Sequence, residues 1–294
     1  MTDLLLASAV RTTPLLILGL AVAIAFRAGM WNIGAEGQFY AGAVVATWIG
    51  TTWGLTSRVG ALLVVPLCAA LAGALWVAVP ALLRSRFGVL EVITTIMLNF
   101  VAEHLVGWLV HGPLQEAGRT YPQSDPLDHA VRLGALVEGT RLTWALPAGI
   151  ALATLSWLVL TRTRPGFTLR AVGANPVAAR VAGGIRVTRV ALTAFLISGA
   201  LAGLAGAAEV TGVTFALYER LSPGFGYTAI AVALLARLHP LWLVVSAFFF
   251  GFLEAGAAAL QRSAGIPSVT VYAVEALIIL LVVVFDRSWR RAGA

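Results

Sequence analysis

A series of long apolar runs constrains the fold of this chain more than any other feature. A helix needs about 20 residues to cross the roughly 30 Å hydrocarbon core of a bilayer, and most of the runs approach that length. Charged residues make up only 11% of the chain, against about 25% in a typical soluble domain. The alternating ten-residue pattern of a membrane β-barrel does not appear. The runs occupy residues 13–26, 38–57, 60–83, 89–110, 143–160, 190–208, 226–236, 241–260 and 269–285.

These runs predict an all-α, polytopic membrane protein. We expect a single transmembrane domain over residues 1–294, with about eight to ten transmembrane helices, some of them broken or re-entrant.

The distribution of arginine predicts how the chain crosses the membrane. Residues 161–189 carry six arginines and no acidic residue, so the positive-inside rule makes this loop cytoplasmic. Counting crossings outward from it places Arg84 and Arg86 inside and the acidic loop at 112–142 outside. The same count puts the N-terminus outside. Either a helix of longer relatives is missing here, or residues 3–26 are irregular.

The residue types also exclude several functions. The chain contains no lysine, and a phosphate-binding P-loop needs one, so ATP and Mg²⁺ would have to be bound by another polypeptide. The lone Cys68 excludes an internal disulfide. His104 and His111 share a helix face but lack the further ligands of a metal site. The net charge of +7 is explained by the orienting arginines and does not indicate nucleic-acid binding. We expect no metal, no cofactor in this chain and no enzymatic activity.

Two polar segments interrupt the apolar pattern, RAGMWNIGAEGQF at 27–39 and EVTGVTFALYERLSPGFG at 209–226. Irregular backbone at membrane depth persists only where protein or a water-filled cavity satisfies its polar groups. Interrupted segments in corresponding positions of two halves point to a transport path. We expect the first break to present Asn32, Glu36 and Gln38 to substrate or to freed backbone groups. A polar turn held by an Arg27–Glu36 pair is the alternative.

Ionisable and amide side chains inside the apolar runs are further candidates, because such groups are costly in a membrane. Glu91, Asn99 and Glu103 form a broad polar stripe on one predicted helix, and Glu209 opens the second interruption. These groups either line a substrate pathway or form hydrogen bonds between helices. The candidate pathway residues are Asn32, Glu36, Gln38, Glu91, Asn99 and Glu209.

The cytoplasmic loop at 161–189 contains a short predicted helix. Asn175 is a suitable N-cap, Pro176 fits the first helical position, and Gly183-Gly184 ends the segment. The loop is either simply solvated or carries a helix that docks into a groove of a cytoplasmic partner.

Several motifs together resemble one family. GFTLRAVGANPVAARVAGG resembles the coupling-helix region of permeases of the branched-chain amino acid/simple sugar class of ABC importers. WNIGAEGQ and FGVLEVITTIMLNF resemble signatures of the nucleoside branch, with Leu90 in place of the usual Asn. SGALAGLAGAAEVTG and YTAIAVALLARLHP also fit, although Ala236 replaces a usual Gly. The matches run from about residue 13 to 285.

This resemblance implies a multi-pass permease subunit of an ABC importer in the bacterial plasma (inner) membrane, most simply for nucleosides. The implied partners are an ATPase with two nucleotide sites, a second related permease that forms a heterodimeric pore, an extracytoplasmic substrate-binding protein (often a lipoprotein) and the surrounding lipid. The implied ATPase-coupling residues are Arg170, Asn175, Pro176, Ala178, Ala179 and Arg180. The alternatives are an ABC permease for a simple sugar such as ribose, and an ion-coupled secondary transporter.

Overall fold

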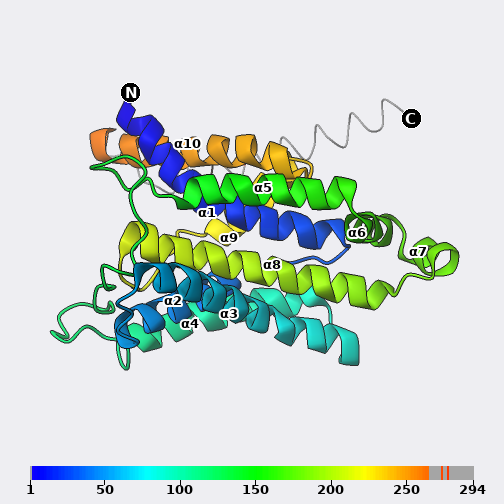
Figure 1. Cartoon of the computed structure of the whole chain (residues 1–294), viewed down its shortest axis with the longest axis horizontal. Helices are drawn as coiled ribbons and strands as arrows, with labels where there is room; N and C mark the ends of the chain where they lie inside the picture. Colours follow the sequence, from blue (N-terminus) through cyan, green and yellow to red (C-terminus); the bar gives the residue numbers. More distant parts are fainter. Residues whose placement is uncertain (1, 265–272, 274–276, 278–294) are drawn as a thin grey trace.

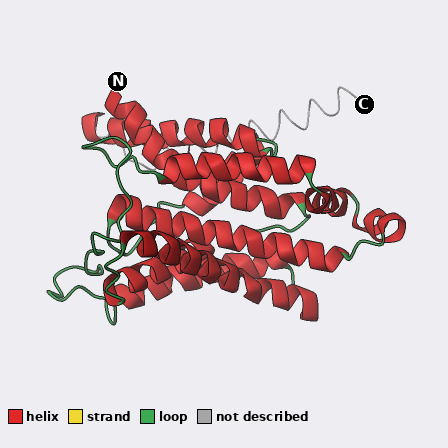
Figure 2. Cartoon of the chain, viewed as in Figure 1, coloured by secondary structure: helices red, strands yellow, loops and turns green. Residues whose placement is uncertain are grey.

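The structure is a computed structural model that describes residues 2–264 together with residues 273 and 277. Except for residues 273 and 277, the predicted apolar segment at 269–285 therefore lies outside the described residues. The described chain is helical, and its strand-like pairing is limited to isolated bridges (Figure 2). The elements are α1 (Thr2–Arg27), α2 (Ala35–Thr52), α3 (Arg58–Phe87), α4 (Glu91–Val110), α5 (Ala145–Arg162), α6 (Arg164–Ala174), α7 (Pro176–Gly183), α8 (Val187–Glu209), η1 (Val210–Thr214), α9 (Phe225–Leu235) and α10 (Pro240–Ala264).

The helices confirm the all-α, polytopic fold. By length and composition, 6 of the described helices can cross a membrane: α1, α3, α4, α5, α8 continued by η1, and α10. Helix α1 is continuous from Thr2 to Arg27 with Pro14 inside it, so the expectation that 3–26 is irregular is wrong. Membrane helices tolerate proline because neighbouring groups satisfy the freed carbonyl.

The two ends of the bundle differ in the way the arginine distribution predicts. Figure 1 shows α6 and α7 at one end and the long connection between α4 and α5 at the other. The last turn of α3 brings Arg84 and Arg86 to the end that carries α6 and α7. We refer to this end as the cytoplasmic end and to the opposite one as the outer end.

Helix α1 lies in the core of the described bundle. Leu15, Leu16, Leu18 and Leu20 are completely buried although they point in different directions around the helix. A helix that is apolar on all sides is enclosed either by protein or by lipid, and α1 is enclosed by protein, because it packs against α5, α8, α9 and α10. The exposed leucines of α3, by contrast, form a face suited to lipid or to another subunit.

Small residues allow α2, α3 and α8 to cross at very close range. A Cβ atom added at Gly203 would overlap the carbonyl oxygen of Ala69, and one added at Gly73 would overlap that of Gly199. A Cβ at Gly42 would overlap the carbonyl oxygen of Gly203. The glycines of SGALAGLAGA thus set the spacing of three helices, as small-residue spacing does in membranes.

This crossing predicts a strong effect of a side chain at Gly203. Gly203→Val should lower the free energy of unfolding by about 1–3 kcal/mol, because the α3 backbone has no room to move away. Thermal unfolding of the purified chain in detergent measures the change. The control is Gly256→Ala in α10, where an added Cβ meets no atom within 4 Å; it should be neutral or slightly stabilising. Equal melting temperatures for Gly203→Val and wild type would contradict the assignment.

Candidate functional site

The first helix break is held by a network of polar side chains. Asn32 and Gln38 form a reciprocal amide pair at 2.9 Å in both directions. Asn32 also donates to Ser198 Oγ of α8 at 2.8 Å and accepts from the Gly34 backbone N–H. Ser198 Oγ in turn donates to the Ala21 carbonyl of α1. Asn32 and Gln38 are buried, so their polar atoms serve the break itself.

Asn99 fastens the break to α4. Its Oδ1 accepts from the Gly37 backbone N–H at 2.8 Å, and its Nδ2 donates to the Ile33 carbonyl at 2.9 Å. The same Nδ2 donates to the hydroxyl oxygen of Tyr227 in α9 at 3.1 Å. Asn99 lies about 12 Å along α4 from Glu91, near the middle of the helix. The break is therefore anchored near the middle of the predicted membrane.

Glu36 joins the first break to the start of α9. Its carboxylate accepts from the backbone N–H of Gly226, in the first turn of α9. A carboxylate at a helix N-terminus satisfies a free donor and complements the helix dipole. The alternative of an Arg27–Glu36 pair is wrong in this geometry, because Arg27 Nε instead donates to the Leu238 carbonyl at 2.7 Å.

Glu91 lies at the cytoplasmic end and contacts the first break only at Trp31. It forms an ion pair with Arg84 across the turn between α3 and α4 and accepts from the backbone N–H of Trp31. Among the predicted pathway residues, Asn32, Glu36, Gln38 and Asn99 come together at the break, whereas Glu91 and Glu209 lie toward opposite ends of the bundle.

The second break follows α8 at the outer end. Helix α8 continues as the π-helical turn η1, and Phe215 then ends the helix with a φ of 57°. The outer loop hydrogen-bonds directly to this segment: Leu133 donates to the Thr211 carbonyl and Leu127 to that of Phe215, both at 2.8 Å. The loop thereby satisfies backbone groups that the end of the helix leaves free.

A cavity of about 560 Å³ opens beside the second break. Glu209 and Phe225 line it, and Phe225 is the first residue of α9. Its lining also includes Tyr218 and three arginines, Arg11, Arg141 and Arg220. Arg11 is held by an ion pair to Glu254 at 3.1 Å. The cavity therefore combines aromatic surface, a carboxylate and guanidinium groups, which suits a ligand with both a planar ring and hydroxyls.

The cytoplasmic helix α7 has the predicted caps. The Asn175 side chain accepts from the backbone N–H groups of Val177 and Ala178, Pro176 begins the helix, and Gly184 follows it with a φ of 57°. Val177 and Val181 are 70% and 80% exposed on this helix. An exposed apolar pair one helical turn apart is suited to contact with a partner groove.

The placement of the six coupling residues is uneven. Four of them are exposed on α7 or at its N-cap: Asn175, Pro176, Ala178 and Arg180. Ala179, on the same helix, is buried. Arg170 belongs to a separate helix, α6, which the sequence pattern did not separate from the loop. A Cβ added at Gly173 of α6 would overlap the Arg27 carbonyl, so α6 packs directly on the end of α1.

Sequence reasoning missed three contributors to these sites. Tyr227 completes the Asn99 network, Ser198 links it to α1, and Arg11 lines the outer cavity. Arg11 and Glu254 carry opposite charges on apolar helices, a signal that could have suggested their pairing. In the described part of the chain, no three His, Cys, Asp or Glu side chains are grouped to hold a metal ion.

The Asn99 network predicts a stability defect. Asn99→Leu would leave the Gly37 N–H and the Ile33 carbonyl without these partners, at a cost of about 1–3 kcal/mol for each unpaired group. Thermal unfolding in detergent should show a melting temperature several degrees lower. The control is Thr94→Val, whose hydroxyl bonds only carbonyls of the preceding turn. If both variants melt like the wild type, Asn99 does not anchor the break.

Comparison with known proteins places the chain in one family. Residues 4–284 match the model described as branched-chain amino acid transport system / permease component. A glucose ABC transporter permease of Haloferax volcanii is 38% identical over 284 residues, which are 93% of this chain and 74% of the relative. A guanosine ABC transporter permease of Bacillus subtilis is 38% identical over 274 residues, covering 92% and 78%. A nucleoside ABC transporter permease of Lactococcus lactis is 30% identical over 283 residues, covering 92% and 76%. No solved structure matches the chain. The chain belongs to the branched-chain amino acid transport system permease family, as a multi-pass permease component of an ABC transporter.

Proposed function

We propose that this permease, which is not itself an enzyme, forms half of a pore that imports nucleosides across the bacterial plasma membrane. The observation that carries the proposal is the outer cavity, in which Phe225 and Tyr218 lie with Glu209 and arginines. Aromatic surface suits a nucleobase, and carboxylate and guanidinium groups suit ribose hydroxyls and base edges. A simple sugar such as ribose is the second candidate, and the relative named as a glucose permease favours it.

The proposed assembly adds partners to this chain. An ATPase with two nucleotide sites would bind ATP and Mg²⁺, and an extracytoplasmic binding protein would deliver the substrate. The relatives include two guanosine permeases of Bacillus subtilis, which are 38% and 27% identical to this chain. Two such permeases in one organism support a heterodimeric pore. The family membership argues against an ion-coupled secondary transporter.

The proposed path runs inward from the outer cavity. Phe225 lines the cavity and begins α9, and the next residue, Gly226, donates to Glu36. We propose that the path continues from the cavity to the contact between Glu36 and Gly226, which we call the joint between the two breaks. Asn99 bonds the residues on either side of this joint: it accepts from Gly37, which follows Glu36, and donates to the half-exposed Tyr227, which follows Gly226. We assign Glu209 to substrate contact, and Glu36 and Asn99 to positioning the joint.

Substrate identity is tested on the extracytoplasmic binding protein encoded with the transporter. Calorimetric titration against guanosine, adenosine, uridine, ribose and glucose should show the tightest binding for a nucleoside. Preference for a free sugar over every nucleoside would replace the first candidate with the second.

The role of Glu209 is tested by uptake in reconstituted vesicles. Glu209→Gln should reduce uptake of the preferred substrate about tenfold or more, since hydrogen bonds to charged groups contribute about 1.5–3 kcal/mol. The matched control is Glu219→Gln, an exposed acid that does not line the cavity. Equal uptake by both variants and the wild type would remove Glu209 from the path.

The docking role of α7 is tested by placing charge on its exposed apolar pair. The variant Val177→Asp with Val181→Asp should assemble less well with the ATPase and should abolish substrate-stimulated ATP hydrolysis, because acidic groups are poorly accommodated in an apolar groove. Thr188→Asp is the control: it introduces an acid at an exposed position of the first turn of α8, where the helix dipole favours it. Charge reversal of Arg170 and Arg180 together should also uncouple transport from ATP hydrolysis. If the double valine variant and the double arginine variant both couple ATP hydrolysis to transport as well as the wild type does, the docking role is overturned.

A further inference from the structure

Glu103 is an acidic side chain of α4 that the proposed path leaves unused. It lies about 18 Å along the helix from Glu91 and about 10 Å before its end at Val110, well inside the roughly 30 Å hydrocarbon core. Glu103 is partly exposed, and in the described part of the chain it forms neither a hydrogen bond nor an ion pair. Ionisable groups at this depth almost always face a bundle interior or a water-filled cavity. The depth of Glu103 therefore favours a water-filled passage beside it over lipid.

Tyr227 of α9 provides a hydrogen-bond donor near this acceptor. Its hydroxyl oxygen accepts from Asn99 Nδ2 at 3.1 Å, and none of the described residues accepts its proton. Asn99 precedes Glu103 by one helical turn, so the two lie on one side of α4. Glu103 also interacts electrostatically with Tyr227. A carboxylate and a hydroxyl group thus lie near each other at a similar depth, and each can form a further hydrogen bond.

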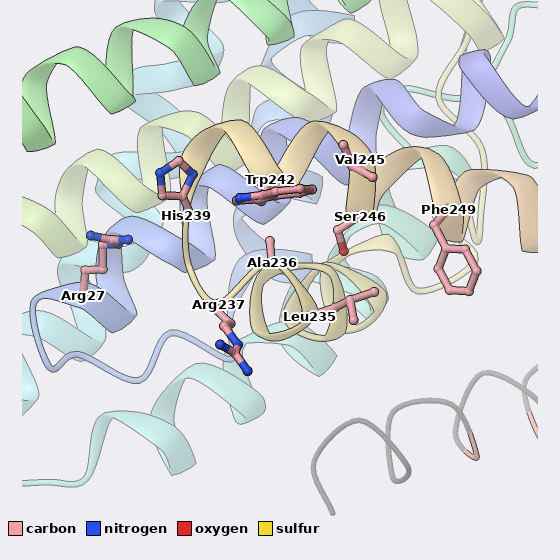
Figure 3. Close-up of a pocket in the computed structure, with 9 residues that line it drawn as sticks. All are labelled: Arg27, Leu235, Ala236, Arg237, His239, Trp242, Val245, Ser246 and Phe249. Carbon is pink, nitrogen blue, oxygen red and sulfur yellow. The ribbon is translucent and has the colours of Figure 1, made fainter. Parts of the chain in front are cut away.

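The side of α9 that carries Tyr227 is not the side that α10 covers. Ser246 of α10 donates to the Val232 carbonyl of α9 at 2.9 Å. Figure 3 shows Ser246 and Trp242 of α10 on the side of α9 toward which Ala236 points. Tyr227 and Ala236 are nine residues apart, which places them about half a turn from each other around the helix. Tyr227, which is 43% exposed, therefore points away from α10.

The charges near this pair are negative. Glu103 interacts electrostatically with Glu36, and within the described residues neither carboxylate is paired with an arginine. The outer cavity differs, because Arg11, Arg141 and Arg220 line it. Carboxylates accept hydrogen bonds from hydroxyl groups and repel anions. The surface at Glu103 is therefore suited to a neutral ligand rich in hydroxyl groups and disfavours a phosphorylated one.

We propose that Glu103 and Tyr227 form a second substrate contact, on a water-filled passage near the middle of the membrane, that binds a neutral hydroxyl-rich substrate and rejects its phosphorylated form. Glu103 would accept from one hydroxyl group of the substrate, and Tyr227 would donate to another. The proposal rests on the proposed uptake function but not on the choice between nucleoside and sugar, since both carry hydroxyl groups. Gly226 lies between Tyr227 and Phe225, which lines the outer cavity. The joint at Gly226 thus separates the two substrate contacts along α9.

Cysteine accessibility tests the site without any substrate. In the assembled transporter carrying Cys68→Ala, Phe100→Cys places a thiol three residues before Glu103, at a position where the native side chain is 50% exposed. A cationic, water-soluble methanethiosulfonate should react about tenfold or more faster than an anionic one, because acidic groups concentrate cations. Adding Glu103→Gln should bring the two rates closer together. The matched control is Leu71→Cys, near the middle of α3 and 55% exposed in the native chain, which should react slowly with both reagents.

Uptake and substrate protection test the contact itself. In reconstituted vesicles Glu103→Gln should reduce uptake of the preferred substrate about tenfold, whereas Glu103→Asp, which keeps the charge, should retain most of it. Guanosine supplied without the binding protein, or ribose if that protein prefers sugars, should slow the modification of Phe100→Cys. The corresponding monophosphate at the same concentration should not slow it.

Equal rates with the two reagents at Phe100→Cys, or a reaction as slow as that of Leu71→Cys, would overturn the water-filled site whatever the substrate is. Unchanged uptake by Glu103→Gln, or no protection by guanosine or ribose, would remove the substrate contact without affecting the role of Glu209. Equal protection by the monophosphate would overturn the rejection of anions. If instead the binding protein binds neither nucleosides nor sugars, the proposed function fails, while a faster reaction with the cationic reagent would still support the acidic passage.

Discussion

The hydrogen bond from the Gly226 backbone to the Glu36 carboxylate is the interaction on which the two broken helices depend. Within hydrocarbon, every backbone donor and acceptor needs a partner inside the protein. Helices α2 and α9 both begin inside the bundle, so each presents unpaired N–H groups there. Glu36 lies in the first turn of α2 and satisfies a donor in the first turn of α9. One side chain therefore ties the starts of two interrupted helices together.

The rest of the first break is built around this joint. Asn99 supplies an acceptor to Gly37 and a donor to Ile33, while the Asn32–Gln38 pair fills the space toward α8. These bonds make the break a fixed structure and explain why so many polar side chains occur in an apolar chain. The same bonds leave Asn32 and Gln38 little capacity for substrate, which is why we propose direct contact at the outer cavity and not at the first break.

Motion at α7 has a short physical route to this joint. Helices α6 and α7 are adjacent along the chain, and Gly173 of α6 packs on the last carbonyl of α1. The break begins directly after α1. A rigid displacement of α6 would therefore move the end of α1, and through Arg27 and Leu238 it would move the turn between α9 and α10 as well. Both interrupted helices would then respond together, because Glu36 connects them.

Local features of the structure could be predicted from the sequence, whereas the long-range partners that hold the first break could not. The Asn175-Pro176 pair predicted the start of α7 because capping involves only neighbouring residues. The glycines and polar residues at 27–39 predicted a break for the same reason. The partner of Glu36 lies 190 residues away, and no local pattern encodes such a pairing. Glu91 lies between the local and the long-range cases. Its partner Arg84 is close in sequence, on the other side of the short connection at Gly88 that joins α3 to α4.

The two breaks also differ in the partners that satisfy their free backbone groups, and this difference bears on transport. The first is held by side chains from α4 and α8 inside the bundle, whereas Thr211, Phe215 and Leu217 of the second are paired with the outer loop. A side-chain network within packed helices resists rearrangement, and the outer loop is also anchored, because Ser124, Leu127 and Val131 are buried. The outer cavity lies beside the loop-held break. Movement of the outer loop beside the cavity would have to break its bonds to Thr211 and Phe215, whereas displacement at α7 would act on the Glu36 joint from the opposite end of the bundle. Access from the two sides of the membrane would then depend on two different sets of hydrogen bonds within one chain.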